Sequence, residues 1–425
     1  MKRLSVLILL PFFLGALETG GFLEIGKTSF TGLDDSPYYP IYNTLRIENH
    51  LGEGDMRGMV SFDTRFFDFG SENTISDLCY VNLLYPIQVN LYEAYFEITG
   101  FILDNLDMKV GKQRIAWGTA DKFNPTDNLN PLDLSNPFNF GERLPSMAVQ
   151  ANYYIKDWTF TGVVLPVFTP SLLPADTLVL PSSITGTLNM PEFKPRNLSY
   201  GVKIGSNIFN FDVSLSYFYG YDPFPIPDSM GAVTGITYGF DRERVFGADF
   251  AGEVKGVGLW GEFGYVAPEK YGLAIKTPVY DSLGNPVGTA SIDTCFLKDP
   301  YYRLTIGFDY TLPWEIYINT QYIHGMPFER KEMITQTGTI TGIGDYIFGR
   351  IEKKFLEGDL KFSLGYAGEV REDSLAYGIV PEIEYHPVDN AKISAGFFQT
   401  WGSKTTFLGR MKDLKMAYIL FRFDF

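Results

Sequence analysis

The sequence has very few of the residues from which catalytic and metal sites are usually built. Its 425 residues include two cysteines, Cys79 and Cys295, and three histidines, His50, His324 and His386. Two cysteines do not make a disulfide framework, and the sequence leaves open whether they are bonded to each other. None of the histidines lies in a Ser- or Asp-rich cluster that would activate a nucleophile. We therefore predict neither an enzyme nor a metal or cofactor site.

Long apolar runs and positive charge are also scarce. After residue 17 no stretch of about 18 uninterrupted apolar residues occurs, so we expect no transmembrane helix. The formal net charge of −15 argues against nucleic acid as a partner, because phosphate binding requires a basic surface. The one apolar run, Leu4 to Leu17, follows Lys2 and Arg3. That pattern is typical of a secretory signal peptide, and we expect residues 1–16 to be removed.

What the sequence has in abundance is alternation with a period of two. In "AYILFRFDF" at the C-terminus, Ala417, Ile419 and Phe421 would face one way and Tyr418 and Leu420 the other. In "VNLYEAYFEI" the same pattern places Tyr92, Ala94, Phe96 and Ile98 opposite Glu93, Tyr95 and Glu97. Alternation over about nine to eleven residues has the length that a tilted strand needs to cross a membrane. We count about eighteen such segments, which begin near Gly21, Ile41, Met56, Val89, Leu106, Ser146, Trp158, Leu198, Phe209, Glu243, Val257, Tyr301, Glu315, Tyr346, Asp359, Ala376, Ala391 and Lys415.

The connections between these segments are alternately short and long. Short turns such as "LGEGD", "VKG" and "HPVD" alternate with long polar connections, roughly 68–88, 117–145, 168–196, 220–240, 267–300 and 324–344. Short turns on one side and long loops on the other are typical of outer-membrane barrels. We therefore predict an all-β protein, a transmembrane, antiparallel up-and-down β-barrel of about 18 strands (16–18), with long extracellular loops and short periplasmic turns. Residues 17–425 would form this barrel as a single domain.

The two faces of each predicted strand differ in polarity. One carries Leu, Ile, Val, Phe and Tyr, which would meet lipid, and the other carries charges that only a water-filled lumen could accommodate. A barrel of sixteen to eighteen strands is wide enough for an aqueous channel. The side chains that we expect to line the lumen include Arg46, Arg57, Arg65, Glu93, Glu97, Arg303, Asp309, Arg350, Glu382 and Glu384, together with Asp63, Lys203 and Glu262.

A turn-rich stretch, "NPTDNLNPLDLSNPF", begins at Asn124 inside the predicted 117–145 connection. Proline fixes its own backbone and restricts the residue before it, and Asp two positions later can bond the local backbone. The stretch should therefore be stiff and braced by its own turns. In the strand before it the alternation slips after Gly111, and a bulge there would return Arg114 to the lumen.

The strand end and the stretch together form the run "VGKQRIAWGTADKFNPTDNLNPLDL". This run resembles the alginate-export porins and a related, largely uncharacterised family of outer-membrane barrels, in which a similar strand end precedes an Asn-Pro-x-Asp loop. The matching positions are Gly111, Lys112, Gln113, Trp117, Gly118, Asn130, Pro131 and Asp133. The resemblance implies that the loop folds into the channel and narrows it. Near that constriction we expect Arg114, Asp121, Lys122, Asp127, Asp133, Glu142 and Arg143. An outward-facing loop, or a calcium site at Asp127 and Asp133, remain alternatives.

These patterns predict an outer-membrane, porin-like channel for passive diffusion of small hydrophilic solutes. The balanced charge of the predicted lumen favours neutral or cationic solutes over a polyanion such as alginate. The final Phe425, after alternating aromatics, resembles the C-terminal strand signal of bacterial outer-membrane proteins. That resemblance implies the outer membrane of a Gram-negative-type bacterium, with its lipid and the barrel-assembly machinery as partners. A homo-oligomer is left open. The alternative function is a structural, adhesive or partner-sheathing barrel that conducts nothing.

Overall fold

The structure is a computed structural model that describes eleven ranges of the chain. They are residues 16–31, 43–66, 87–134, 141–173, 186–231, 235–269, 271–280, 286–296, 299–331, 342–413 and 415–425. Residues 1–15 of the predicted signal peptide, Cys79, and the third Asn-Pro pair at Asn136 and Pro137 lie outside the described ranges. The signal peptide therefore stays a prediction, and the sequence made none about a bond between Cys79 and Cys295.

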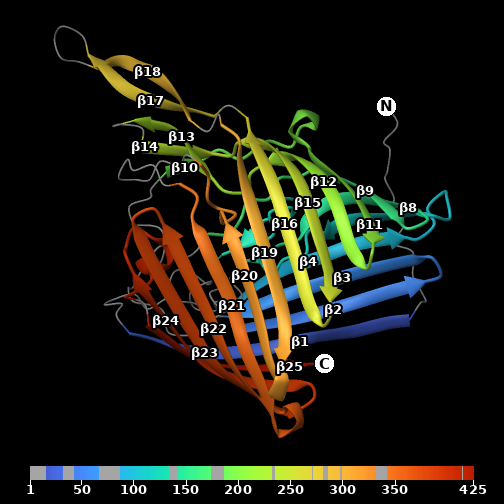
Figure 1. Ribbon diagram of the computed structural model, residues 1–425. Helices are drawn as coiled ribbons and strands as arrows, with labels where there is room; N and C mark the ends of the chain where they lie inside the picture. The colour runs from blue at the N-terminus through green and yellow to red at the C-terminus, as the bar shows by residue number, and fades with distance from the viewer. Residues whose placement is uncertain are drawn as a thin grey trace.

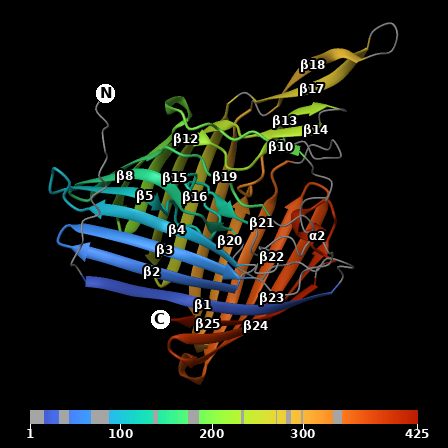
Figure 2. The same cartoon turned by 180° about the vertical axis from the view of Figure 1, so that it is seen from behind.

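Eighteen antiparallel strands form one closed sheet around a lumen (Figures 1 and 2). The first nine in ring order are β1 (Ala16–Thr31), β2 (Asn43–Glu53), β3 (Met56–Phe66), β4 (Ile87–Ile98), β5 (Leu106–Gln113), β8 (Ser146–Ile155), β9 (Trp158–Leu165), β11 (Ser199–Ile208) and β12 (Phe211–Tyr221). The other nine are β15 (Arg242–Val254), β16 (Val257–Pro268), β19 (Tyr301–Leu312), β20 (Ile316–His324), β21 (Asp345–Phe355), β22 (Leu360–Arg371), β23 (Ser374–Val388), β24 (Ala391–Gly402) and β25 (Lys415–Asp424). The predicted fold class is confirmed.

Pairing of the last strand with the first closes the ring. Strand β25 pairs with β1 from Phe22 to Thr31, and Phe425 exchanges two backbone hydrogen bonds of 3.0 Å with Gly21. Closure satisfies the backbone donors and acceptors that an open sheet edge would leave without partners in lipid. Helix is nearly absent among the described residues, apart from three 3₁₀ turns and α2 (Phe407–Arg410), and none of it is long and apolar enough to span a bilayer.

The lengths of the connections follow the predicted rhythm. Two-residue turns join β2 to β3, β8 to β9, β11 to β12, β15 to β16 and β23 to β24, all at one end of the barrel. Lys156, Phe209, Asn210 and Lys255 in these turns have positive φ values, as tight primed hairpin turns require. The other end carries the long connections, except that only residues 372–373 separate β22 from β23.

A second sheet lies beyond the long-loop end of the barrel (Figure 1). Its strand order is β10 (Gly186–Leu188), β14 (Gly235–Gly239), β13 (Ile226–Gly231), β17 (Tyr271–Tyr280) and β18 (Pro286–Phe296). The sequence predicted only loops here. The parallel pairings β10–β14 and β13–β17 join segments from different connections, and no local pattern predicts such pairings.

Much of the barrel wall separates the two kinds of side chain as expected, although some apolar side chains, such as Val245 and Val266, face inward and pack against the chain inside the barrel. On β16 and β19, Phe263 and Ile306 point outward and are exposed, whereas Glu262 and Thr305 point inward and are fully buried. Tyr92 was predicted to face lipid with Ala94, and that prediction is wrong. A bulge shifts the β3–β4 register between Ser61 and Phe62 and leaves Tyr92 as the extra residue. Tyr92 therefore points to the inner face, as Glu93 does.

Candidate functional site

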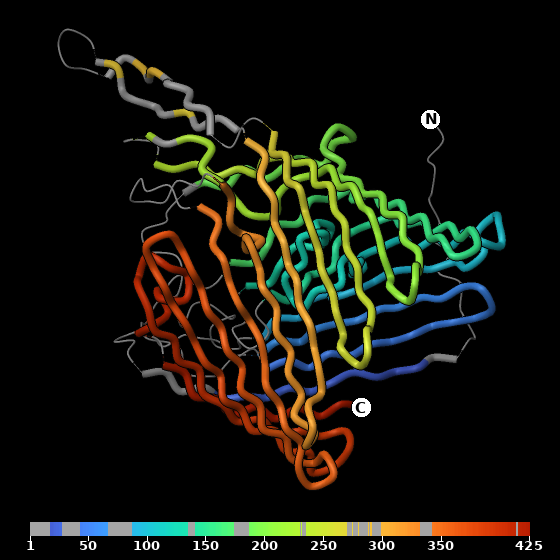
Figure 3. Tube along the Cα trace, viewed as in Figure 1, coloured from blue at the N-terminus to red at the C-terminus, as the bar shows by residue number. Residues whose placement is uncertain are grey.

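After Gln113 the chain leaves the barrel wall and enters the lumen. Residues 114–134 and 141–145, called here the inward segment, contact inward-facing side chains on opposite walls. On β3, Arg65 lies 3.6 Å from Asp133, and on β19 the Thr305 hydroxyl donates to the Phe123 carbonyl at 3.2 Å. Strands β3 and β19 are nine places apart in the ring of eighteen, so the segment spans the lumen. Figure 3 shows its teal trace inside the barrel.

One carboxylate, that of Glu262 on β16, holds much of the inward segment. Glu262 Oε1 accepts from the backbone N–H groups of Thr119 and Ala120 at 2.5 and 2.6 Å, and from Asn124 Nδ2 at 2.8 Å. Its Oε2 accepts from the backbone and the hydroxyl of Thr126 at 3.2 and 2.8 Å. Glu262 is only 1% exposed. A buried carboxylate with five donors is a strong anchor, because hydrogen bonds to a charged acceptor are about twice as strong as neutral ones.

Strand β20 provides a second attachment beside Glu262. Asn319 Nδ2 donates to Asp121 Oδ2 at 2.8 Å, and Gln321 Nε2 donates to the Asp121 carbonyl at 2.9 Å. Asp121 is thereby fixed against the wall through both its side chain and its backbone. Three neighbouring strands, β16, β19 and β20, thus attach the same short stretch of the inward segment.

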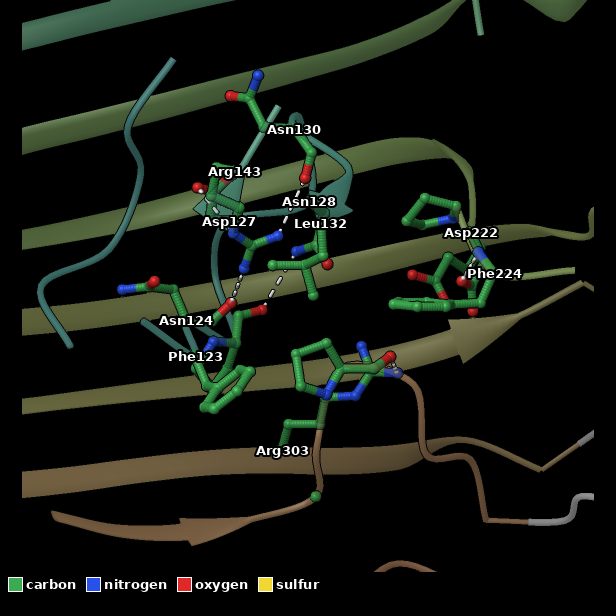
Figure 4. A pocket seen from close by; sticks show the side chains of 15 residues that line it. Phe123, Asn124, Asp127, Asn128, Asn130, Leu132, Arg143, Asp222, Phe224 and Arg303 are labelled. Atoms are coloured by element: carbon green, nitrogen blue, oxygen red, sulfur yellow. Dashed lines mark hydrogen bonds and ion pairs between the residues drawn. The ribbon is translucent and has the colours of Figure 1, made fainter. Parts of the chain in front are cut away.

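The inward segment is also braced internally, by side chains that join residues far apart along it (Figure 4). Asn130 Oδ1 accepts from Ile115 N at 2.9 Å, and its Nδ2 donates to the Leu144 carbonyl at 2.8 Å. The short strands β6 (Leu132–Asp133) and β7 (Glu142–Arg143) pair beside it. Arg143 donates to the Asn130 carbonyl at 3.0 Å and lies 3.5 Å from Asp127. Burial raises the pKa of Asp127 and lowers the pKa of Arg143.

The residues of the sequence motif have identifiable structural roles. Gln113 is fully buried, and its amide nitrogen donates to the Ala148 carbonyl at 3.3 Å. Trp117 is buried against the wall beside Gly201. Gly118 has φ of +85°, and a Cβ there would lie 2.5 Å from Glu262 Oε1. Glycine at 118 therefore lets the segment approach its anchor.

Gly118→Ala should destabilise the barrel by about 1–3 kcal/mol, because alanine is strained at positive φ and its methyl group would displace Glu262. Thermal melting of the refolded protein in detergent measures this loss. Gly54→Ala is the matched control, since Gly54 has φ of +59° with nothing within 4 Å of the added methyl. The control should lose only about 1 kcal/mol. Equal losses in both variants would show that contact with Glu262 contributes nothing.

The predicted bulge near Gly111 does not occur. Strand β5 pairs with β8 without interruption from Leu106 to Gln113, and Gly111 keeps its place opposite Ala148. A Cβ on Gly111 would lie 2.3 Å from the Ala94 carbonyl oxygen. Glycine at this position therefore allows β4 and β5 to approach each other closely. Arg114 reaches the lumen because the chain leaves the sheet there, and its N–H donates to Glu93 Oε1 at 2.7 Å.

The seven predicted constriction residues all belong to the inward segment, but their exposure differs. Arg114, Asp121 and Lys122 are exposed, and Glu142 is half-buried. Asp127, Asp133 and Arg143 are buried and hold the segment together. Asp127 forms an ion pair with Arg143, and Asp133 forms one with Arg65. No group of His, Cys, Asp or Glu suited to a metal ion occurs among the described residues.

The predicted lumen-lining residues project inward from the wall. Arg46 and Asp63 form an ion pair of 2.6 Å, and Tyr317 donates to Asp309 at 3.3 Å. The rest of this set, Arg57, Arg65, Glu93, Glu97, Arg350, Glu382 and Glu384, lies on the same inner face by strand alternation. Arg303 differs because the connection after β20 covers it. Arg303 Nη2 donates to the carbonyls of Pro327 and Glu329 at 2.9 and 3.0 Å, and so does not meet open water.

Two sizeable cavities lie beside the inward segment. A cavity of about 430 Å³ is bounded by strands β1–β3 and β23–β25, with Arg46, Glu382 and Arg422 in its lining. A second cavity of about 270 Å³ lies along the segment itself, beside Arg114. Glu142 lines both. Between the segment and residues 222–224 and 325–327, only about 20 Å³ remains (Figure 4).

At the long-loop end, Asp241 precedes β15, and its backbone carbonyl accepts from Asp222 N at 2.9 Å. Burial, and then the charge of Asp222, raises the pKa of Asp241 to about 7. The folded protein therefore binds this proton more tightly than the unfolded chain. The resulting stability is present below about pH 4 and is lost as pH rises towards 7.

Unfolding free energy should thus fall by about 2 kcal/mol between pH 4 and 7 through Asp241, allowing for solvent screening. Asp241→Asn keeps the size of the side chain and removes the titration, so this part of the pH dependence should disappear. Melting temperatures of both proteins, recorded in detergent across this pH range, measure the difference. Parallel curves would contradict the assignment.

Two of the three histidines each pair with one acidic side chain among the described residues. His324 Nδ1 lies 2.8 Å from Asp345 Oδ1, and His386 Nε2 lies 2.9 Å from Glu384 Oε1. The ring of His324 also stacks on Tyr302. These two pairs lie on different faces of the barrel wall, since Tyr302 points outward and Glu384 lines the lumen cavity.

Comparison with known proteins gives a clear result for the fold. No family model and no curated protein sequence matches the chain. The crystal structure of Pseudomonas aeruginosa OpdK with vanillate matches with a TM-score of 0.53 and 9% identity, over 96% of this chain and 98% of OpdK. Acinetobacter baumannii OccAB1 matches with a TM-score of 0.52 and 9% identity, over 96% of both chains. This chain has the fold of outer-membrane β-barrel porins.

A third similar structure is that of a carbohydrate-binding barrel. Wzi of Escherichia coli is described as an outer-membrane protein involved in group 1 capsule assembly and a carbohydrate-binding β-barrel. It matches with a TM-score of 0.50 and 10% identity, over 97% of this chain and 85% of Wzi. At such low identities the likeness concerns the porin fold alone. The finer resemblance to alginate-export porins stays a prediction that rests on the motif.

Proposed function

We propose that the protein is an outer-membrane channel for passive diffusion of small hydrophilic solutes, narrowed by the inward segment. The observation that carries this proposal is the attachment of one segment to both walls, at Arg65 on β3 and at Glu262 on β16. A segment held in this way reduces the open cross-section without closing it, because the two cavities beside Glu142 remain. The wide lumen of an 18-stranded barrel is otherwise water-filled.

The passage runs off-centre, along strands β1–β3 and β23–β25. Its lining has both signs of charge: Glu24, Asp63, Glu142, Glu382 and Glu384 are acidic, and Arg46, Arg65, Lys392 and Arg422 are basic. A mixed lining offers no excess of positive charge to a polyanion, so neutral or cationic solutes of small size fit best. The solutes named for OpdK and Wzi, vanillate and carbohydrate, differ too much to indicate one for this chain.

The proposed location is the outer membrane of a Gram-negative-type bacterium, with the long loops outside. The predicted signal peptide, the closed barrel and the C-terminal Phe425 support it. Assembly by the barrel-assembly machinery, through the β25 strand, belongs to the same proposal. A homo-oligomer is compatible with the apolar outer wall and is not needed for the passage described.

The second candidate is a barrel that conducts nothing and presents a surface to a partner. The sheet of β10, β13, β14, β17 and β18 favours it, because this sheet stands outside the barrel and takes no part in the passage. The cavities beside Glu142 favour the channel.

Planar-bilayer recording of the refolded protein separates the two candidates. A channel gives stable unitary current steps with a weak preference for cations. A correctly folded barrel, judged by its heat-modifiable migration and β-rich circular dichroism, that gives no steps at any voltage would contradict the channel and leave the partner-presenting role.

A further inference from the structure

A row of aromatic side chains crosses the outer wall near the long-loop end. Tyr217 on β12 pairs with Phe246 on β15, Phe246 with Tyr265 on β16, and Tyr265 with Tyr302 on β19. The first ring pair is 5.1 Å apart, and the rings from Phe246 onward are more than two-fifths exposed. Aromatic belts of this kind lie at the membrane–water interface, at the level of the lipid headgroups.

Two arginines stand on the same outer face, immediately on the long-loop side of this row. Because side chains alternate along a strand, Arg242 and Arg244 on β15 share the outward face with Phe246. Their guanidinium groups lie 4.1 and 5.1 Å from the ring centroid of Tyr219 on β12. Arg242 donates to the carbonyls of Arg196 and Leu198, both at 2.7 Å, which fixes its position.

Basic side chains slightly outnumber acidic ones around this pair, in an otherwise acidic chain. Lys194 and Arg196 precede β11 and are exposed, and the Arg196 carbonyl accepts from Arg242. The acids nearby are Glu192, paired with Lys194, Glu269, 3.1 Å from Arg244, and Asp241, the residue before Arg242. The Arg244 side chain is 45% exposed despite that pair. Guanidinium groups bind phosphate through parallel hydrogen bonds, and their flat faces stack on aromatic rings as they do here.

We propose that Arg242 and Arg244, with Arg196 and Lys194 beside them, bind the phosphate groups of a phosphorylated lipid in the outer leaflet. Two observations fix the class of ligand. The aromatic row places these four basic residues at the depth of the lipid headgroups. Their positive charge complements phosphate, whereas the loops as a whole are acidic. The inference rests on the proposed orientation of the barrel, with the long loops outside. The site lies on the outer wall and is independent of the passage.

Binding of diphosphoryl lipid A to the refolded protein, followed by native mass spectrometry or by the rise in melting temperature in detergent, tests this site. The Arg242→Gln/Arg244→Gln variant should lose about tenfold or more in affinity. Because Arg242 also holds residues 196–198, Arg244→Gln alone is included and should lose part of the binding with no change in circular dichroism. Dephosphorylated lipid A should bind equally weakly to all variants, and inorganic phosphate should not displace the lipid at millimolar concentration.

The matched control removes two positive charges at the opposite rim. Lys255 lies in the β15–β16 turn, and Lys353 lies over the ring of Phe355 near the end of β21. Lys255→Gln/Lys353→Gln should leave binding unchanged. Equal loss in this control, or undiminished binding in both arginine variants, would overturn the site. The unaltered protein and its three variants should all have the same unitary conductance. Loss of lipid binding with unchanged conductance therefore concerns the lipid site alone, and absence of conductance in all of them concerns the channel alone.

Discussion

Glu262→Ala should increase the unitary conductance at least about twofold, because it removes the anchor of the inward segment. Five hydrogen bonds to this buried carboxylate disappear together, and the donors of Thr119, Ala120 and Thr126 lose their partner. Each donor left without a partner costs about 1–3 kcal/mol when it is buried. The attached stretch should then leave the wall and sample the lumen. Planar-bilayer recording should show larger steps with more frequent switching between levels.

Glu382→Ala is the matched control for Glu262. Glu382 also projects inward, from β23, and lines the same cavity as Glu142, but it accepts from the Tyr418 hydroxyl at 2.6 Å and does not anchor the inward segment. Because the anchor stays in place, the Glu382→Ala protein should keep quiet steps, and its conductance should change much less than that of Glu262→Ala. If Glu262→Ala behaved like this control, the segment would not depend on Glu262 for its position.

Glu142→Arg should shift ion selectivity towards anions by about fivefold to tenfold. Glu142 lines both cavities beside the inward segment, and it accepts from Tyr92 at 2.8 Å. The substitution changes the local charge by two units within a few ångströms of a passing ion, which is worth about 1–2 kcal/mol even at the dielectric constant of water. Reversal potentials in a potassium chloride gradient measure the change.

The control for Glu142 carries the same change of charge outside the passage. Glu357 is exposed in the 3₁₀ turn η4 (Leu356–Gly358) at the short-turn end. Glu357→Arg should leave the reversal potential nearly unchanged at moderate salt, because exposed charges are screened within about 10 Å. A shift of equal size in both variants would mean that Glu142 does not face the conducting path.

The barrel itself could be predicted from local sequence patterns. Strands β3, β5, β16 and β25 begin at Met56, Leu106, Val257 and Lys415, the positions that alternation indicated. Alternation works here because each strand meets lipid on one side and charged or packed side chains on the other, so the period-two pattern is imposed along its whole length. The sequence also indicated a stiff segment here, and side-chain contacts of Asn130 and Arg143 do brace it.

Contacts between distant parts of the chain could not be predicted in the same way. Glu262 was expected to line the lumen, but nothing near it in sequence indicates that it holds Thr119, 143 positions earlier. The bulge that turns Tyr92 inward depends on its pairing with β3, and the bulge predicted at Gly111 was wrong because the chain leaves the wall instead. The second sheet depends on pairing between separate loops.

The most direct test of whether the inward segment narrows a channel is the unitary conductance of the refolded protein with and without residues 124–138. This deletion removes the Asn-Pro stretch, including the contacts of Asn124, Thr126 and Asp133 with the barrel wall. We expect stable steps in the intact protein and clearly larger steps in the deleted one. Steps of the same size in both proteins would contradict it, because the inward segment would then not narrow the channel.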